Sequence, residues 1–366
     1  MKTEGRKQKA EGSQDKTAAF CCLLLSAFCL LLGVPQAHAA GAWTKQSSSS
    51  LAWLHAVYFL DENRGWAVGG KGMLLATNDG GRVWRALRRP SEDALLDVYF
   101  SDAQNGWLVC ERSIYDLKTN DEARTYLLHT MDSGASWTKV NVLGKETNAR
   151  LVRALFTDDG RGWTFGEAGA LYTTRDSGAN WERQRVPTRH LLLGGAFLNG
   201  AQGWLVGAGA TILQTSDGGQ TWHADTIVGV TGLAGAAENQ PVRFTAASFA
   251  DQRHGWAVGA AGRIFITNDG GRTWHEQQSN VRADLYDVKF LDAVEGWAVG
   301  AEGTLLHTID GGLHWDSVLS GTTHALERLC FAGRTRGWAV GFGGTIITYT
   351  SNAAVPQRPE MKKGKP

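Results

Sequence analysis

GWAVGAAGRIFITNDGGRTW, residues 255–274, is one version of a stretch that recurs along the whole chain. A Gly-Trp pair opens each of seven copies, at Gly65, Gly106, Gly162, Gly203, Gly255, Gly296 and Gly337. Four of the six intervals between these glycines are 41 residues. A unit of this length cannot bury its apolar face alone, so the period predicts a fold that stacks copies of one supersecondary unit.

Two further landmarks accompany each Gly-Trp pair. A phenylalanine lies six residues before it in all seven copies, and in six copies a Ser/Thr-x-Asp-x-Gly-x-x-Trp turn follows. The aspartates of these turns are Asp79, Asp132, Asp176, Asp217, Asp269 and Asp310. We expect each to accept hydrogen bonds from backbone N–H groups one to three residues on, while the glycines supply positive φ. The six aspartates are therefore predicted to be structural.

Each copy reads as four short strands, which end at the Phe, run through the Gly-Trp, precede the Asp and start at the turn Trp. This pattern predicts an all-β, seven-bladed β-propeller over residues 40–350. The seventh copy lacks its Asp turn, and Trp43-Thr44-Lys45-Gln46 resembles the outer strands and lies 22 residues before Gly65, at the regular spacing. We therefore expect the N-terminal strand to complete the last blade and leave no free edge.

Both ends of the chain differ from the repeats. Residues 1–39 are predicted to be a secretory signal peptide, with basic residues up to Lys16, an apolar run over 18–34 and Ala37-His38-Ala39 as the cleavage site. The alternative is a membrane anchor, because the apolar run is close to the lower limit for a spanning helix. Cys21, Cys22 and Cys29 lack the context of a lipidated N-terminus, so no lipoprotein is expected. Residues 351–366 are predicted to be a disordered polar tail.

Charge and cysteine content narrow the class of protein. The formal net charge is +1, without the basic excess of a nucleic-acid partner, and no nucleic acid is expected. Export would place the protein in the periplasm. Cys110 and Cys330 fall on blades that a whole blade separates, too far for a disulfide. We expect both to be buried hydrophobes and the protein to be a monomer.

The repeat is interrupted at three places. Residues 111–126 contain an insertion of 12 residues between the second and third strands of one blade, and the connections after Trp137 and Trp222 are also longer than the regular ones. In a four-stranded blade these segments emerge on the face opposite the Asp turns. Insertions on one face of a repeat array indicate its binding side.

Arginines are concentrated in the same segments. The candidate partner-binding residues are Arg150, Arg153, Arg183, Arg185, Arg189 and Arg328. The position three before the repeat Phe holds Asp97, Arg153, Asp287 and Arg328, which predicts a mixed-charge ring at the mouth of the central channel. The alternative interpretation is a solvated rim, since surface arginines are common.

No enzyme class is indicated, and no cofactor or metal is expected. The Asp turns recur in bacterial sialidases and some glucanases, so a glycoside hydrolase or a carbohydrate-binding propeller is the alternative function. A sialidase also needs an Arg-Ile-Pro signature, which is absent, and a glycosidase needs two carboxylates about 5–10 Å apart. Asp97 and Asp287 are the acids that would have to form this catalytic pair. The repeat positions of the tryptophans indicate blade packing for all but Trp53.

Residues 41–350 resemble the photosystem II stability/assembly factor family, whose blades carry Phe-x-x-x-x-x-Gly-Trp-x-Val-Gly followed by Thr-x-Asp-Gly-Gly-x-x-Trp. Residues 59–84, 249–274 and 290–315 carry this pattern. The resemblance implies an exported, non-catalytic assembly factor that is peripheral to the membrane through a membrane or envelope protein client. It also implies an arginine patch on the propeller face, for which the six arginines above are the candidates. In a photosynthetic organism the resemblance implies a thylakoid-lumen-like compartment in place of the periplasm.

Overall fold

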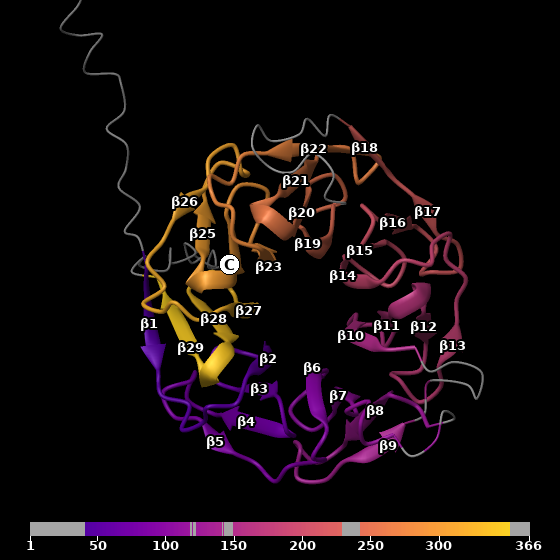
Figure 1. Cartoon of the computed structure of the whole chain (residues 1–366), viewed down its shortest axis with the longest axis vertical. Helices are drawn as coiled ribbons and strands as arrows, with labels where there is room; N and C mark the ends of the chain where they lie inside the picture. The colour runs from indigo at the N-terminus through magenta and orange to yellow at the C-terminus, as the bar shows by residue number, and fades with distance from the viewer. Residues whose placement is uncertain are drawn as a thin grey trace, which may run out of the picture. The chain divides into compact units, whose positions relative to one another are not determined.

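The computed structural model describes residues 41–117, 119, 122–140, 142, 149–228 and 242–351, all within the compact unit Gly41–Asn352. These residues form seven sheets arranged as a ring (Figure 1). The predicted seven-bladed, all-β propeller is therefore confirmed. The predicted signal peptide, residues 1–39, and the tail beyond Ser351 lie outside the described residues.

In six blades the four repeat strands follow sequence order from the channel outward, and in the seventh the N-terminal strand is outermost. The inner strands are β2 (Leu54–Phe59), β6 (Ala94–Phe100), β10 (Leu151–Phe156), β14 (Leu192–Phe197), β19 (Phe244–Phe249), β23 (Leu285–Phe290) and β27 (Leu326–Ala332). The second strands are β3 (Gly65–Gly69), β7 (Gly106–Glu111), β11 (Gly162–Gly166), β15 (Gly203–Gly207), β20 (Gly255–Gly259), β24 (Gly296–Gly300) and β28 (Arg336–Gly341).

The outer half of each blade contains the third and fourth strands. The third strands are β4 (Met73–Thr77), β8 (Thr125–Thr130), β12 (Leu171–Thr174), β16 (Ile212–Thr215), β21 (Ile264–Thr267), β25 (Leu305–Thr308) and β29 (Ile346–Thr350). The outer strands are β5 (Arg85–Ala86), β9 (Thr138–Val140), β13 (Glu182–Arg183), β17 (His223–Ala224), β22 (Thr273–Gln277), β26 (Asp316–Ser317) and, in the seventh blade, β1 (Ala42–Gln46). Single 3-10 turns, η1 (Glu167–Gly169), η2 (Ala260–Gly262), η3 (Ala301–Gly303) and η4 (Phe342–Gly344), join four second strands to their third strands.

The N-terminal strand closes the ring as expected. β1 pairs antiparallel with β29, and Trp43 lies opposite Tyr349 in this ladder. The Trp43 ring also contacts Trp297 and Phe331, with ring centroids 5.5 and 6.1 Å away. The first strand of the described chain therefore supplies the outer edge of the last blade.

A close contact explains the fixed spacing from Phe to Gly-Trp. Phe249 pairs with Gly255 across the first hairpin of its blade, and a Cβ added to Gly255 would lie 2.3 Å from Cε1 of Phe249. The repeat phenylalanine covers the glycine in the same way in the other six blades. Only glycine leaves room for the ring there.

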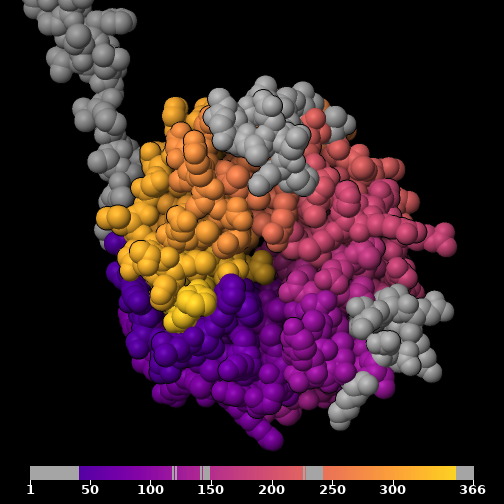
Figure 2. Space-filling model, in the orientation of Figure 1, coloured from indigo at the N-terminus to yellow at the C-terminus, as the bar shows by residue number. Residues whose placement is uncertain are grey.

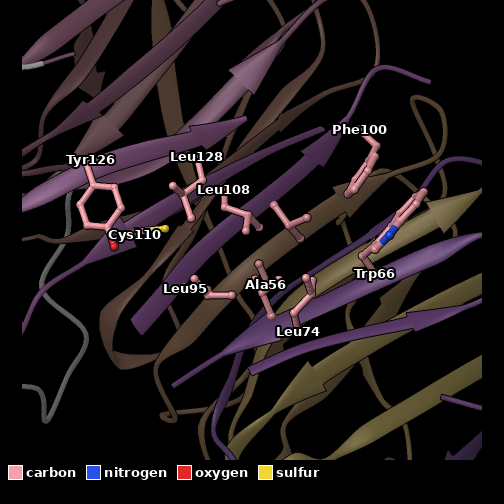
Figure 3. Packing of buried hydrophobic residues seen from close by; sticks show 11 residues of the cluster. Ala56, Trp66, Leu74, Leu95, Phe100, Leu108, Cys110, Tyr126 and Leu128 are labelled. Atoms are coloured by element: carbon pink, nitrogen blue, oxygen red, sulfur yellow. The ribbon is translucent and has the colours of Figure 1, made fainter. Parts of the chain in front are cut away.

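Neighbouring blades are joined by the repeat aromatic residues. Trp256 stacks on Phe290 of the next blade with centroids 3.4 Å apart, and Trp338 stacks on Phe59 at the same distance across the closure. The core between the first two blades contains Trp66 against Phe100, together with Cys110 (Figure 3). Neither Cys110 nor Cys330 forms a disulfide, as expected.

Each of the six turn aspartates accepts hydrogen bonds within its own turn, but the donors differ from those predicted. Asp269 Oδ1 accepts from the N–H of Thr273, four residues on, at 3.0 Å, whereas one to three residues was expected. The N–H four residues on donates to the aspartate in all six turns. The Thr267 hydroxyl donates to Asp269 Oδ1 and accepts from the N–H of Gly271. The threonine, and not the aspartate, therefore accepts the hydrogen bond from the glycine N–H within the turn.

The two faces of the ring carry different loops. The first-to-second-strand turns meet the Asp turns, as the Gly80 N–H that donates to Asn63 O at 2.9 Å illustrates, and together they form the Asp-turn face. The second-to-third-strand turns meet the blade-to-blade connections, as in Gly72 N–H to Asp93 O at 2.8 Å, and form the connection face. The insertion within residues 111–126 lies on the connection face, as expected.

One blade departs from the four-stranded prediction. β18 (Thr226–Val228) pairs parallel with β22 of the next blade and makes that sheet five-stranded. β18 belongs to the long connection after Trp222, and residues 229–241 of that connection lie outside the described residues.

Candidate functional site

Ion pairs fix the insertion to the connection face. The hairpin of β7 and β8 continues into it, since the Arg112 N–H donates to Arg124 O at 2.9 Å. Glu111 is the centre of the network, because it pairs with Arg124 at 2.7 Å and with Arg150 of the next blade at 2.8 Å. Arg112 pairs with Glu122 at 3.5 Å. The insertion is thus tied to two blades.

Two apolar side chains of the insertion are exposed to solvent. Ile114 and Tyr115 are 55% and 90% exposed. At its base, the Tyr126 hydroxyl donates to Asp93 Oδ2 at 2.6 Å, and the Lys139 ammonium lies 4.4 Å from the centre of the Tyr126 ring. The base is therefore fixed, while Ile114 and Tyr115 are available for contact.

The structure does not bring the six candidate arginines into one cluster. Arg183 lies on the outer strand β13, and Arg185 and Arg189 follow in the connection to the next blade; all three are exposed. Arg150 is engaged with Glu111. Arg153 and Arg328 instead line the central channel. The expectation that Arg153 belongs to an exposed patch is wrong, because its strand directs it toward the channel axis.

A buried charge network crosses the channel. Arg153 Nε lies 3.9 Å from Asp97 Oδ2 of the preceding blade, and Arg153 Nη2 lies 3.7 Å from Asp287 Oδ1 on the sixth blade. The side chains of Arg153, Asp97 and Asp287 are 13%, 9% and 5% exposed. The predicted mixed-charge ring is thus present, but within the channel rather than at its mouth.

A β-bulge in every inner strand sets which residues line each level of the channel. In β10 the register shifts between Leu151 and Arg153, and the equivalent shift recurs in the other inner strands. The residues at the bulge include His55 and Glu327.

Burial, followed by the positive charges of Arg328 and Arg150, lowers the pKa of His55 to about 4.

Two aromatic residues, Trp53 and Phe342, contact each other on the connection face, and the sequence pattern singles out only Trp53. Trp53 donates its indole N–H to Glu327 Oε1 at 3.1 Å, and its ring contacts Phe342 edge-on at 5.5 Å. Trp53 and Phe342 are 45% and 49% exposed. Trp53 was singled out because it lies outside the repeat. Phe342 was missed, although it replaces a residue that is small in most other copies.

The part of the chain that the structure describes contains neither a metal-ligand cluster nor a helix that could cross a membrane. There, no group of three or more His, Cys, Asp or Glu side chains could hold a metal ion. Over the same residues, no helix combines the length and the apolar character needed to span a bilayer.

A family model and the similar curated proteins all point to one protein family. The sequence model described as "Photosynthesis system II assembly factor YCF48" matches residues 82–189, 173–276, 238–322 and 275–354. The chain is 30% identical over 131 residues to "Photosystem II assembly lipoprotein Ycf48" of Synechococcus sp. (strain CC9902), covering 34% of this chain and 35% of that protein. It is 27% identical over 127 residues to "Photosystem II stability/assembly factor HCF136, chloroplastic" of Arabidopsis thaliana, covering 33% and 28%. The match spans about a third of these relatives.

Solved structures share the architecture. "YCF48 bound to D1 peptide" superposes with a TM-score of 0.66 at 21% identity, covering 85% of this chain and 97% of that one. A GH74 xyloglucanase from Xanthomonas campestris superposes with a TM-score of 0.61 at 14% identity, covering 87% and 55%. At these identities the likeness shows the propeller fold alone.

Proposed function

Because the chain belongs to the family of photosystem II assembly factor YCF48, we propose that it is an exported, non-catalytic assembly factor. Its connection face binds a polypeptide segment of a membrane-protein client. The chain acts as a monomer and is peripheral to the membrane through that client. Two relatives are named as a lipoprotein and as a chloroplastic factor, and these names support the proposal that the chain is exported.

The observation that carries this proposal is the insertion clamped on the connection face. Glu111 joins the base of the insertion to Arg150 of the next blade through two short ion pairs. The clamp presents Ile114 and Tyr115 outward beside a rigid ring. A preorganised loop loses less conformational entropy on binding, which favours a role in recognition.

The chemistry of the exposed side chains indicates the kind of client segment. Arg183, Arg185 and Arg189 are exposed, and guanidinium groups pair with carboxylates in a bidentate manner and stack on aromatic rings. Aromatic side chains such as Tyr115 are enriched at protein interfaces. The segment should therefore combine acidic residues with apolar ones. Arg150 supports the site by holding the insertion.

Glycoside hydrolysis is disfavoured by the position of Arg153. Asp97 and Asp287 are the acids that could form a catalytic pair in the channel, yet the guanidinium of Arg153 lies within 4 Å of both. A sugar ring would have to occupy the same space. This geometry supports a non-catalytic role.

A site-specific photocrosslinker tests the proposal. A benzophenone amino acid replaces Arg185 on the connection face or Val83 on the Asp-turn face, and the protein is irradiated in its native host. We expect the Arg185 variant alone to crosslink to an integral membrane protein, because both positions are exposed but only Arg185 lies on the connection face. Crosslinks of equal yield from both positions would overturn the proposal.

A further inference from the structure

We propose that the central channel contains a second binding site, which takes a small organic monocarboxylate and recognises its carboxylate through Arg328. The site is a cavity of about 420 Å³ whose lining includes Arg328, Arg153, Lys289, Tyr58 and Tyr99. It opens toward the Asp-turn face, because its lining runs from the charged network to the phenylalanines that end the inner strands. It is therefore independent of the client site on the connection face.

Arg328 is a cation of this cavity that has no ion-pair partner among the described residues. No carboxylate among them lies within 4 Å of its guanidinium, and its Nε is buried without a hydrogen-bond partner. Glu327, the acid next to it in sequence, accepts from the Trp53 indole N–H and interacts with Arg328 through charge attraction beyond ion-pair distance. A buried guanidinium N–H without an acceptor is costly, and an incoming carboxylate would supply two acceptors.

The acids of the cavity are already engaged. Asp97 Oδ2 accepts from the Ala154 N–H at 3.1 Å, and Asp287 Oδ2 accepts from the Leu329 N–H at 2.9 Å. Both acids also face Arg153. Three cationic side chains, Arg153, Arg328 and Lys289, thus line a cavity with two carboxylates, and the excess positive charge is at Arg328 and Lys289.

The lining of the cavity also includes an aromatic cluster that suits an apolar body. Tyr58 and Tyr99 contact each other edge-on at 5.1 Å, and Tyr99 stacks on Phe156 at 4.8 Å. In the space-filling view side chains fill most of the opening between the inner strands (Figure 2), and the cavity is within the size range of small-molecule sites. The charge of Asp158 acts on both tyrosines, which disfavours a ligand with a second negative charge.

Titration calorimetry with small probes tests this site at low ionic strength. Phenylacetate is the probe, and phenylacetamide is its neutral counterpart of the same shape. We expect phenylacetate to bind with one-to-one stoichiometry and phenylacetamide to bind at least about tenfold more weakly, because a hydrogen bond to a charged group is lost. Inorganic phosphate, which lacks an apolar body and carries more charge, should also bind at least about tenfold more weakly.

Variants locate the binding site. Arg328→Met should weaken phenylacetate at least about tenfold, whereas Arg82→Met, on the exposed Asp-turn face, should leave it unchanged. If Arg328→Met does not fold, Lys289→Met replaces it, since Lys289 is exposed and lines the same cavity. Any one of four results would overturn the proposal. Phenylacetate does not bind, phenylacetamide or phosphate binds as tightly as phenylacetate, or the channel variant keeps the parent protein's affinity for phenylacetate.

Discussion

At the scale of single residues, the turn aspartates act through local geometry. Asp269 accepts from the N–H and the hydroxyl of Thr273 and from the hydroxyl of Thr267. These hydrogen bonds lower the pKa of the Asp269 carboxyl although burial opposes them. The aspartate therefore remains ionised and bound within its own turn, where it contacts no other blade through these bonds.

Replacement of Asp269 measures its structural role. Asp269→Ala should lower the free energy of unfolding by about 1–3 kcal/mol, because the turn donors lose their acceptor. Urea denaturation gives this value, and Glu182→Ala, which removes an exposed acid on β13, is the control. An unchanged free energy of unfolding would show that the turn forms without the carboxylate.

Arg153 has a different role, because it neutralises two buried acids. Arg153→Met would leave Asp97 and Asp287 facing the channel without their shared cation, at a cost on the order of 3 kcal/mol. Arg328→Met should cost much less, since Arg328 has no such acid partners among the described residues. Parallel urea denaturation of the two variants distinguishes them, and equal losses would contradict this assignment.

Asp225, between β17 and β18, makes stability depend on pH. Burial raises the pKa of its carboxyl to about 7, the charge of Asp269 adds to the rise, and the Trp274 indole N–H acts in the opposite direction. An unfolded chain loses this proton near pH 4. Between about pH 4 and 7 the native state binds more protons, so its stability falls as the pH rises through this window.

The Asn variant isolates this contribution. Asp225→Asn should be more stable than the parent protein at pH 8 by on the order of 2 kcal/mol, after allowance for partial exposure, and the advantage should disappear near pH 4. Thermal unfolding from pH 4 to 8 measures the difference between the two proteins. A difference that does not change with pH would mean that Asp225 titrates normally.

At the scale of elements, the closing strand determines whether the ring is complete. β1 covers the free edge of β29, and Trp43 packs on Trp297, Phe331 and Tyr349. A chain that starts at Ser47 should therefore melt at a much lower temperature than one that starts at Gly41. Differential scanning calorimetry compares the two, and equal melting temperatures would contradict closure by β1.

The same elements show how far the sequence determines the structure. The closure could be predicted because Trp43 keeps the regular spacing to Gly65 and so carries the repeat signature. β18 could not, because its residues follow no repeat and its partner β22 is defined only by tertiary packing. The depth of Arg153 was also missed, since a bulge between Leu151 and Arg153 changes which side chains face the channel.

At the scale of the whole ring, the two faces carry different loops and side chains, which agrees with the separate sites that we propose for them. The Asp-turn face repeats almost unchanged from blade to blade, and the proposed carboxylate cavity opens within it. The connection face carries the insertion, Trp53 and Phe342, and three exposed arginines. A rigid ring allows these surfaces to differ because the blade core beneath them is shared.

The client's affinity for two charge-reversal variants tests the central claim most directly. Arg183, Arg185 and Arg189 are replaced by Glu in one variant, and Arg82 and Arg272 of the Asp-turn face in the other. All five side chains are exposed, so both variants should melt close to the parent protein. We predict that the crosslinked client, once purified, loses affinity only for the connection-face variant. Equal loss from both variants, or loss from neither, would contradict a single client-binding face.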